Sequence, residues 1–196
     1  MKNINTFALI VLFLFSPFIA FLFSLYMLRQ NYSYTHFLSF FMGLCAILFP
    51  PYADLYRHTL TYFSFWSDTS ALWETILLNS DFLLTGLSCL FAKGHIPFEI
   101  VRFLFVFVCY EIYFALFKYY AFRNEWLQAH PKSLFIAFLI TFALVPFIWI
   151  VNGLRQVTAC TVMLWATYLI FERHKSYGWL LCWDLVFIFP LWLLRW

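Results

Sequence analysis

The sequence Asn152-Gly153-Leu154-Arg155-Gln156 forms a short polar break between two long hydrophobic runs, Ser133–Val151 and Val157–Phe171. An arginine so close to hydrocarbon is costly unless it pairs or meets an anionic ligand. The residues that follow, Val157-Thr158-Ala159-Cys160-Thr161, are small or β-branched, which suits a tightly packed helix start. The break therefore predicts a candidate site where a new helix begins.

The composition is typical of a membrane protein. The 196 residues are 65% hydrophobic, 25% aromatic and 11% charged, with a mean hydropathy of +0.84. No soluble core absorbs so many aromatic side chains, so we expect the chain to lie in a lipid bilayer. The net charge of +3 is too small and too scattered for nucleic-acid binding.

The cysteines and the known catalytic spacings give no metal or cofactor signal. The sequence contains no CxxC pair and no HExxH, GxSxG, P-loop or zinc spacing. We therefore expect no cofactor and no metal site, and interpret the cysteines as packing residues in apolar stretches. They are Cys45, Cys89, Cys109, Cys160 and Cys182.

The hydrophobic runs predict an all-α, polytopic helical membrane protein. A spanning helix needs roughly 20 apolar residues, and by that criterion there are about seven hydrophobic segments. Helices are expected because the runs exceed strand length and show no alternation. The segments form a single transmembrane domain over residues 1–196: Phe7–Leu28, His36–Phe49, Thr75–Phe91, Glu99–Tyr120, Ser133–Val151, Val157–Phe171 and Tyr177–Leu194.

Three of these segments carry particular expectations. Phe7–Leu28 is long enough to span alone, and we expect Pro17 to kink it without breaking it. His36–Phe49 ends at Pro50-Pro51 and predicts a short or tilted span. The last segment stops at Trp196 without a polar tail, which predicts a domain truncated at its C-terminus.

The lysines and arginines favour an N-terminus on the cytoplasmic side. With seven full spans, the loop after Pro51 would then lie inside, and Arg102 and Arg155 outside. If the Pro51 loop and Arg155 belong to one site, one segment must fail to span. The candidate for such a re-entrant helix is Thr75–Phe91, which several polar residues interrupt: Asn79, Asp81, Thr85 and Ser88.

Arg155 admits two interpretations. Gly153 permits a sharp connection, so Arg155 is expected in the first turn of the next helix. A guanidinium beside the free backbone N–H groups of a helix start would hold a phosphate bidentately. Alternatively, Arg155 is an interfacial residue whose side chain reaches lipid headgroups. The residues alone leave both interpretations open.

A second candidate cluster follows Pro50-Pro51. If this stretch is helical, Asp54, Arg57 and His58 share one face at positions i, i+3 and i+4. A carboxylate beside an imidazole can act as a base or orient one. On chemistry alone, an amphipathic interfacial helix is the favoured alternative. Its aromatic belt would comprise Tyr52, Tyr56, Tyr62 and Trp66.

Charged residues inside hydrophobic segments are a third group. Asp81, Glu111 and Asp184 would be costly facing lipid, so each is expected to face the helix bundle or a water-filled cavity. Glu111 and Lys118 are two turns apart on one helix face and could share a network without pairing directly. The simplest interpretation of these charges is structural pairing.

These features resemble the EpsG family of polysaccharide polymerases, which is related to the Wzy O-antigen polymerases. Leu154-Arg155-Gln156-Val157-Thr158-Ala159 matches the aliphatic-Arg-Gln-x-x-Ala signature of that family, and Asp54-Leu55-Tyr56 supports the match. The resemblance implies a multi-pass protein of the bacterial inner membrane. Such a glycosyltransferase joins repeat units carried on polyprenyl pyrophosphate in O-antigen, capsule or exopolysaccharide biosynthesis.

The resemblance also implies roles for the residues. Arg155 would stabilise the leaving pyrophosphate, and Asp54 or His58 would position or deprotonate the acceptor. The residues that would bind substrate are Tyr56, Arg57, Asn152 and Gln156. The expected partners are the polyprenyl-pyrophosphate-linked glycan, the lipid bilayer and other membrane proteins of polysaccharide assembly.

Two other functions compete with the polymerase. One is a small non-enzymatic membrane subunit that packs against partners and uses Arg155 only for lipid headgroups. The other is a flippase for a lipid-linked sugar, since broken helices and buried acids also occur in transporters. A flippase would predict inverted repeats, which the sequence does not show.

Overall fold

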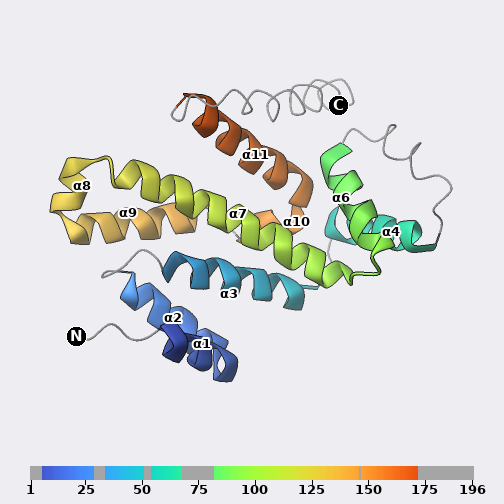
Figure 1. Ribbon diagram of the computed structural model, residues 1–196, viewed down its shortest axis with the longest axis horizontal. Helices are drawn as coiled ribbons and strands as arrows, with labels where there is room; N and C mark the ends of the chain where they lie inside the picture. The colour runs from blue at the N-terminus through green and yellow to red at the C-terminus, as the bar shows by residue number, and fades with distance from the viewer. Residues whose placement is uncertain (1–5, 29–33, 51–53, 68–81, 146, 172–196) are drawn as a thin grey trace.

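The computed structural model describes residues 6–28, 34–50, 54–67, 82–145 and 147–171 of the chain. Every regular element within these ranges is a helix, so the expected all-α class is confirmed for them (Figure 1). The helices are α1 (Thr6–Phe15), α2 (Pro17–Met27), α3 (Thr35–Leu48), α4 (Asp54–Ser67), α6 (Phe82–Lys93), α7 (Phe98–Ala121), α8 (Glu125–Ala129), α9 (Pro131–Leu144), α10 (Phe147–Asn152) and α11 (Leu154–Phe171).

The central element is α7, which crosses the middle of Figure 1. Its 24 residues give a length of about 36 Å, enough to cross a hydrocarbon core of about 30 Å. Among the described helices it is the one long and apolar enough to span a membrane. Helices α3, α6, α9, α10 and α11 all contact it.

Side-chain contacts fix the direction of each neighbour along α7. Lys118 Nζ, near the end of α7, donates to Thr35 Oγ1 at the start of α3, 3.1 Å away. Arg102, near the start of α7, donates to the carbonyl of Phe49 just after α3. The two helices are therefore antiparallel.

Helix α9 runs antiparallel to α7, and α11 runs parallel to α7. The ring of Phe138 lies 5.4 Å from that of Phe117, whereas Tyr110 donates to the carbonyl of Val145 at the end of α9. Along α11, Thr161 contacts Cys109, and Tyr168 packs on a tyrosine nearer the end of α7, Tyr119. Helix α10 joins the two and contacts both α7 and α4.

Prolines set the ends of three of the described helices. The residue before a proline is pushed out of the helical region by the proline ring. Ser16 has φ −153° and ψ 89°, Phe49 has φ −74° and ψ 124°, and Val145 has φ −104° and ψ 78°. Each of the three precedes a proline, so α1, α3 and α9 end where they do because of the following residue.

Two expected segments are consequently divided. The expectation that Pro17 only kinks Phe7–Leu28 is wrong, because Ser16 is not helical and separates α1 from α2. The run Ser133–Val151 is likewise split into α9 and α10 at Val145. None of the four resulting helices reaches the roughly 20 residues that a span requires.

The path of the chain between α3 and α7 does not fit a count of seven full spans. That count places Phe49 and Arg102 on opposite sides, yet Arg102 Nη1 lies 2.8 Å from the carbonyl oxygen of Phe49. The reason is the excursion between them, in which the short helices α4 and α6 contact each other and return the chain to the same end of α7 (Figure 1). Residues 75–81 and Tyr177–Leu194 lie outside the described residues.

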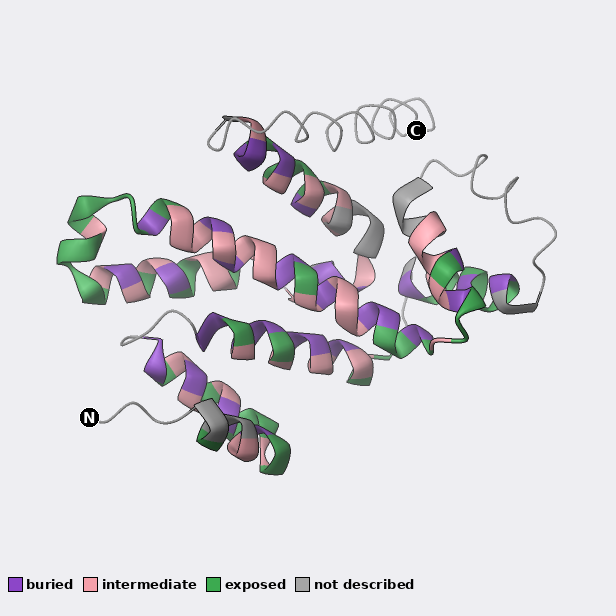
Figure 2. Ribbon diagram, in the orientation of Figure 1, coloured by how far each residue is buried: buried purple, intermediate pink, exposed green. Residues whose placement is uncertain are grey.

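Small residues allow α3 and α7 to approach closely. Thr35, Ser39, Gly43 and Ala46 are all buried on α3. A Cβ atom added at Gly43 would lie 2.8 Å from Cδ2 of Phe103 and 3.2 Å from its carbonyl oxygen. Close approach through small residues is a usual way for helices to associate in membranes. By contrast, α8 has no buried residue and lies at the exposed far end of α7 (Figure 2).

Candidate functional site

The break between α10 and α11 lies where the sequence predicted it. Helix α10 ends at Asn152, and α11 begins at Leu154, with its first turn closed by a hydrogen bond of 2.9 Å from the backbone N–H of Val157 to the carbonyl of Gly153. Arg155 and Gln156 therefore occupy the first turn of α11, as expected. Their side chains lie outside the described residues. The first backbone N–H groups of a helix have no partner within it and can bind an anion.

Asn152 adds an acceptor at this break. The residue is half-buried, and its Oδ1 is inaccessible and has no hydrogen-bond partner among the residues that the structure describes. Leaving a buried acceptor unpaired costs about 1–3 kcal/mol. The break thus combines an open amide acceptor with the start of a helix.

The second candidate cluster is helical, which was the condition for its residues to share a face. Helix α4 begins at Asp54, whose side chain lies outside the described residues. Leu55 is fully buried, Tyr56 and Arg57 are exposed, and His58 is half-buried. Helix α4 therefore packs against the core through Leu55 and leaves Tyr56 and Arg57 on its exposed side.

Tyr62 does not belong to an exposed aromatic belt, contrary to the expectation for an interfacial helix. It is fully buried, packs on Phe98 with ring centroids 4.9 Å apart, and donates to the carbonyl of Ile96. These contacts fasten α4 to the start of α7. Of the other predicted belt residues, Tyr56 is exposed, while Tyr52 and the side chain of Trp66 lie outside the described residues.

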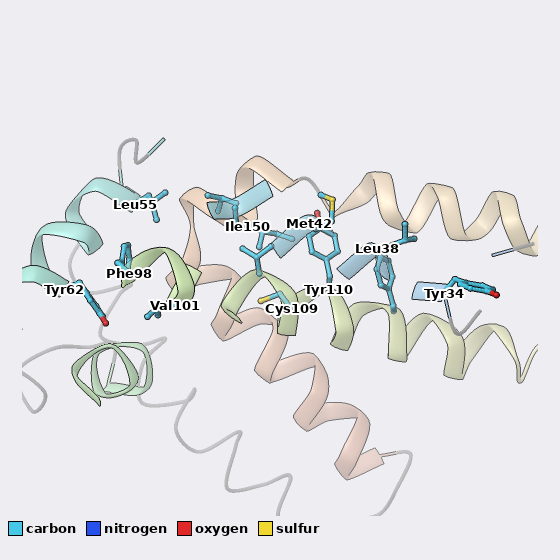
Figure 3. Close-up of a cluster of buried hydrophobic side chains, with 14 of the residues drawn as sticks. Tyr34, Leu38, Met42, Leu55, Tyr62, Phe98, Val101, Cys109, Tyr110 and Ile150 are labelled. Carbon is cyan, nitrogen blue, oxygen red and sulfur yellow. The ribbon is translucent and has the colours of Figure 1, made fainter. Parts of the chain in front are cut away.

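The fold brings both clusters to one end of α7, the end that begins with Phe98. Helix α4 follows α3 there, and α11 follows α10 there, with α4 and α10 in contact. The rings of Phe49 and Phe147 meet edge to face, with centroids 5.8 Å apart. Figure 3 shows Leu55 and Ile150 in the same buried cluster as Phe98.

Arg102 is a polar residue at this end for which the sequence predicted a side of the membrane but no role. It is 3% exposed, and its guanidinium donates to the carbonyls of Phe49 at 2.8 Å and Ile47 at 3.4 Å. Its position inside an apolar helix was the available signal, because a charge there needs a partner. The identity of that partner could not be read from local sequence.

A separate polar contact lies farther along α7. The Oε2 of Glu111 lies 2.7 Å from Nδ1 of His36, so the expected structural pairing of this acid is confirmed. Lys118 contacts the neighbouring Thr35 and forms no direct ion pair with Glu111 among the described residues, as expected. Asp81 and Asp184 lie outside the described residues.

The described part of the chain contains no group of three or more His, Cys, Asp or Glu side chains that could hold a metal ion. What the site offers is a helix start with a guanidinium on its first turn, an open amide acceptor, and a second helix start with a carboxylate and an imidazole. The helix start with its guanidinium suits an anion, the amide acceptor suits a donor group such as an N–H or a hydroxyl, and the second helix start suits proton transfer.

In the part of the chain that the structure describes, fold and site together define an all-helical protein, in which one helix is long and apolar enough to cross a membrane. Comparisons with protein-family models, curated proteins and solved structures gave no match.

Proposed function

We propose that this protein is a multi-pass membrane polysaccharide polymerase of the bacterial inner membrane, which joins repeat units carried on polyprenyl pyrophosphate. One observation carries the proposal: the first turn of α11, with Arg155 and Gln156, begins at the same end of α7 as α4 with Asp54 and His58. In this proposal the first turn of α11 binds the pyrophosphate, and the start of α4 accepts a proton from the same substrate.

The exposed surface supports several membrane crossings. Large apolar side chains are strongly exposed on helices other than α7, including Phe15 at 85%, Leu48 at 83% and Leu144 at 75%. Large apolar side chains exposed in this number are unfavourable in water and favourable in lipid. The antiparallel course of α3, α7 and α9 would carry the chain repeatedly from one end of the bundle to the other.

The proposed reaction is a glycosyl transfer. An acceptor hydroxyl oxygen bonds to the anomeric carbon of the donor chain while the bond from that carbon to the pyrophosphate oxygen breaks. Asp54 or His58 takes the hydroxyl proton. The lipid pyrophosphate leaves with both bonding electrons, and Arg155 binds the negative charge that develops. The amide N–H groups of Asn152 and Gln156 would donate to the pyrophosphate, and the exposed Tyr56 and Arg57 would bind the sugar side.

The test is chain extension by the purified protein in liposomes supplied with polyprenyl-pyrophosphate-linked repeat units. We expect a ladder of longer glycans on a gel and release of polyprenyl pyrophosphate in matching amounts. Products no longer than the supplied unit would contradict the proposal. A non-enzymatic subunit that only binds anionic headgroups would give such unextended products.

A further inference from the structure

We infer that Arg102 is a positioning residue of the candidate site: it holds the end of α3, and with it the start of α4, against α10 and the start of α11. Its importance for catalysis rests on the function proposed above. The geometry itself can be tested without any activity.

The first step is the contact with α3. This helix ends at Leu48 because Phe49 precedes Pro50, so the last carbonyls of the helix have no partner within it. The guanidinium of Arg102 donates to two of these carbonyls, those of Phe49 and Ile47. A cation at the negative end of a helix dipole is also favourable electrostatically. One side chain of α7 therefore caps the end of α3.

The second step is the charge balance of Arg102. Its side chain is 4% exposed, and among the described residues it pairs with Glu99, whose carboxylate oxygen is 3.9 Å away on a side chain that is 48% exposed. Its Nε is buried without a hydrogen-bond partner among the described residues. The carbonyls at the end of α3 are therefore its shorter contacts, and moving that end away would leave the buried guanidinium with only the distant, half-exposed Glu99. This penalty restricts where Phe49 can lie.

The third step leads from Phe49 to the site. The ring of Phe49 packs on Phe147, the first residue of α10, and α10 ends at Asn152 beside the start of α11. In the other direction, the chain passes from Phe49 to the start of α4 at Asp54. The start of α4 and the start of α11 therefore both depend on the position of Phe49, and Arg102 fixes that position.

The test is a distance measurement between spin labels on α4 and α11 in the full chain. One label is placed at Leu60→Cys, an exposed position of α4, and the other at the native, exposed Cys160, with the other native cysteines replaced. A reference pair joins Cys160 to Ile136→Cys, which is exposed on α9. With Arg102 present, both pairs should give one narrow distance population.

Arg102→Met should cause the 60–160 pair to lose its single narrow population while the 136–160 pair keeps its own. Arg102→Lys should recover part of the narrow population, because one ammonium can still donate to a carbonyl. Lys118→Met, which removes the matching polar contact at the opposite end of α3, should leave the 60–160 pair unchanged.

Two results would overturn the inference. One is a narrow 60–160 population in Arg102→Met, and the other is equal broadening of both pairs, which indicates general loss of structure. Failure of the proposed polymerase would appear differently, as intact distances in Arg102-containing protein that extends no glycan.

Discussion

Arg155→Lys should reduce chain extension on lipid-linked repeat units by roughly 100-fold or more, the usual effect of removing a donor that stabilises developing charge. Lysine keeps the positive charge but lacks the planar pair of donors that binds a pyrophosphate bidentately. Because Arg155 lies in the first turn of α11, where the chain already changes direction, the substitution should not disturb folding. The measurement is the rate of product-ladder growth in liposomes.

Arg123→Lys provides the matched control. Arg123 follows the opposite end of α7, where it is exposed and contacts Tyr119. Its substitution should leave the rate unchanged, and both variants should insert at the wild-type level. An Arg155→Lys protein that extends glycans at the wild-type rate would mean that Arg155 serves lipid headgroups only.

Gly43→Ala should lower the free energy of unfolding by about 1–3 kcal/mol, the usual cost of overpacking. The new Cβ would lie 2.8 Å from the ring of Phe103 and 3.2 Å from its carbonyl oxygen. The ring cannot move away easily, because it stacks on Phe107 and meets the edge of Phe40. Helices α3 and α7 would have to separate. Thermal or denaturant unfolding in detergent gives the difference.

Gly86→Ala is the control for this experiment. Gly86 also lies within a helix, α6, but nothing among the described residues lies within 4 Å of a Cβ added there. Alanine should therefore leave stability unchanged or raise it by up to about 1 kcal/mol through its better helix propensity. If Gly43→Ala behaved in the same way, the close approach of α3 and α7 would be contradicted.

The sequence predicted the helices whose ends are decided locally. The bounds of α3 and α7 follow the hydrophobic runs to within one or two residues, and α11 begins at the expected polar break. The helix ends before Pro17 and Pro146 were harder to predict, because a helix can continue through proline if the carbonyls that lose their hydrogen bonds find other donors. Here the carbonyl of Val145 accepts a hydrogen bond from the hydroxyl of Tyr110, which is 35 residues away. Such a contact cannot be read from the neighbouring sequence.

In the candidate site, too, local features could be predicted from the sequence and long-range contacts could not. The position of Arg155 in a first turn and the helical start at Asp54 follow from nearby glycine and proline residues. Their placement at one end of α7 depends on the return of the chain through α4 and α6, which a count of spans cannot predict. Arg102 was missed because its acceptor, Phe49, lies 53 residues before it.

The most direct test of this account is the accessibility of single cysteines in intact vesicles of known orientation, with the five native cysteines replaced. A membrane-impermeant maleimide should label cysteines at positions 54 and 155 from the same side of the membrane. A cysteine at Trp126, which is 58% exposed in α8 at the opposite end of α7, should be labelled from the other side. Labelling of positions 54 and 155 from opposite sides would contradict the account, because Asp54 and Arg155 could then not act on one substrate.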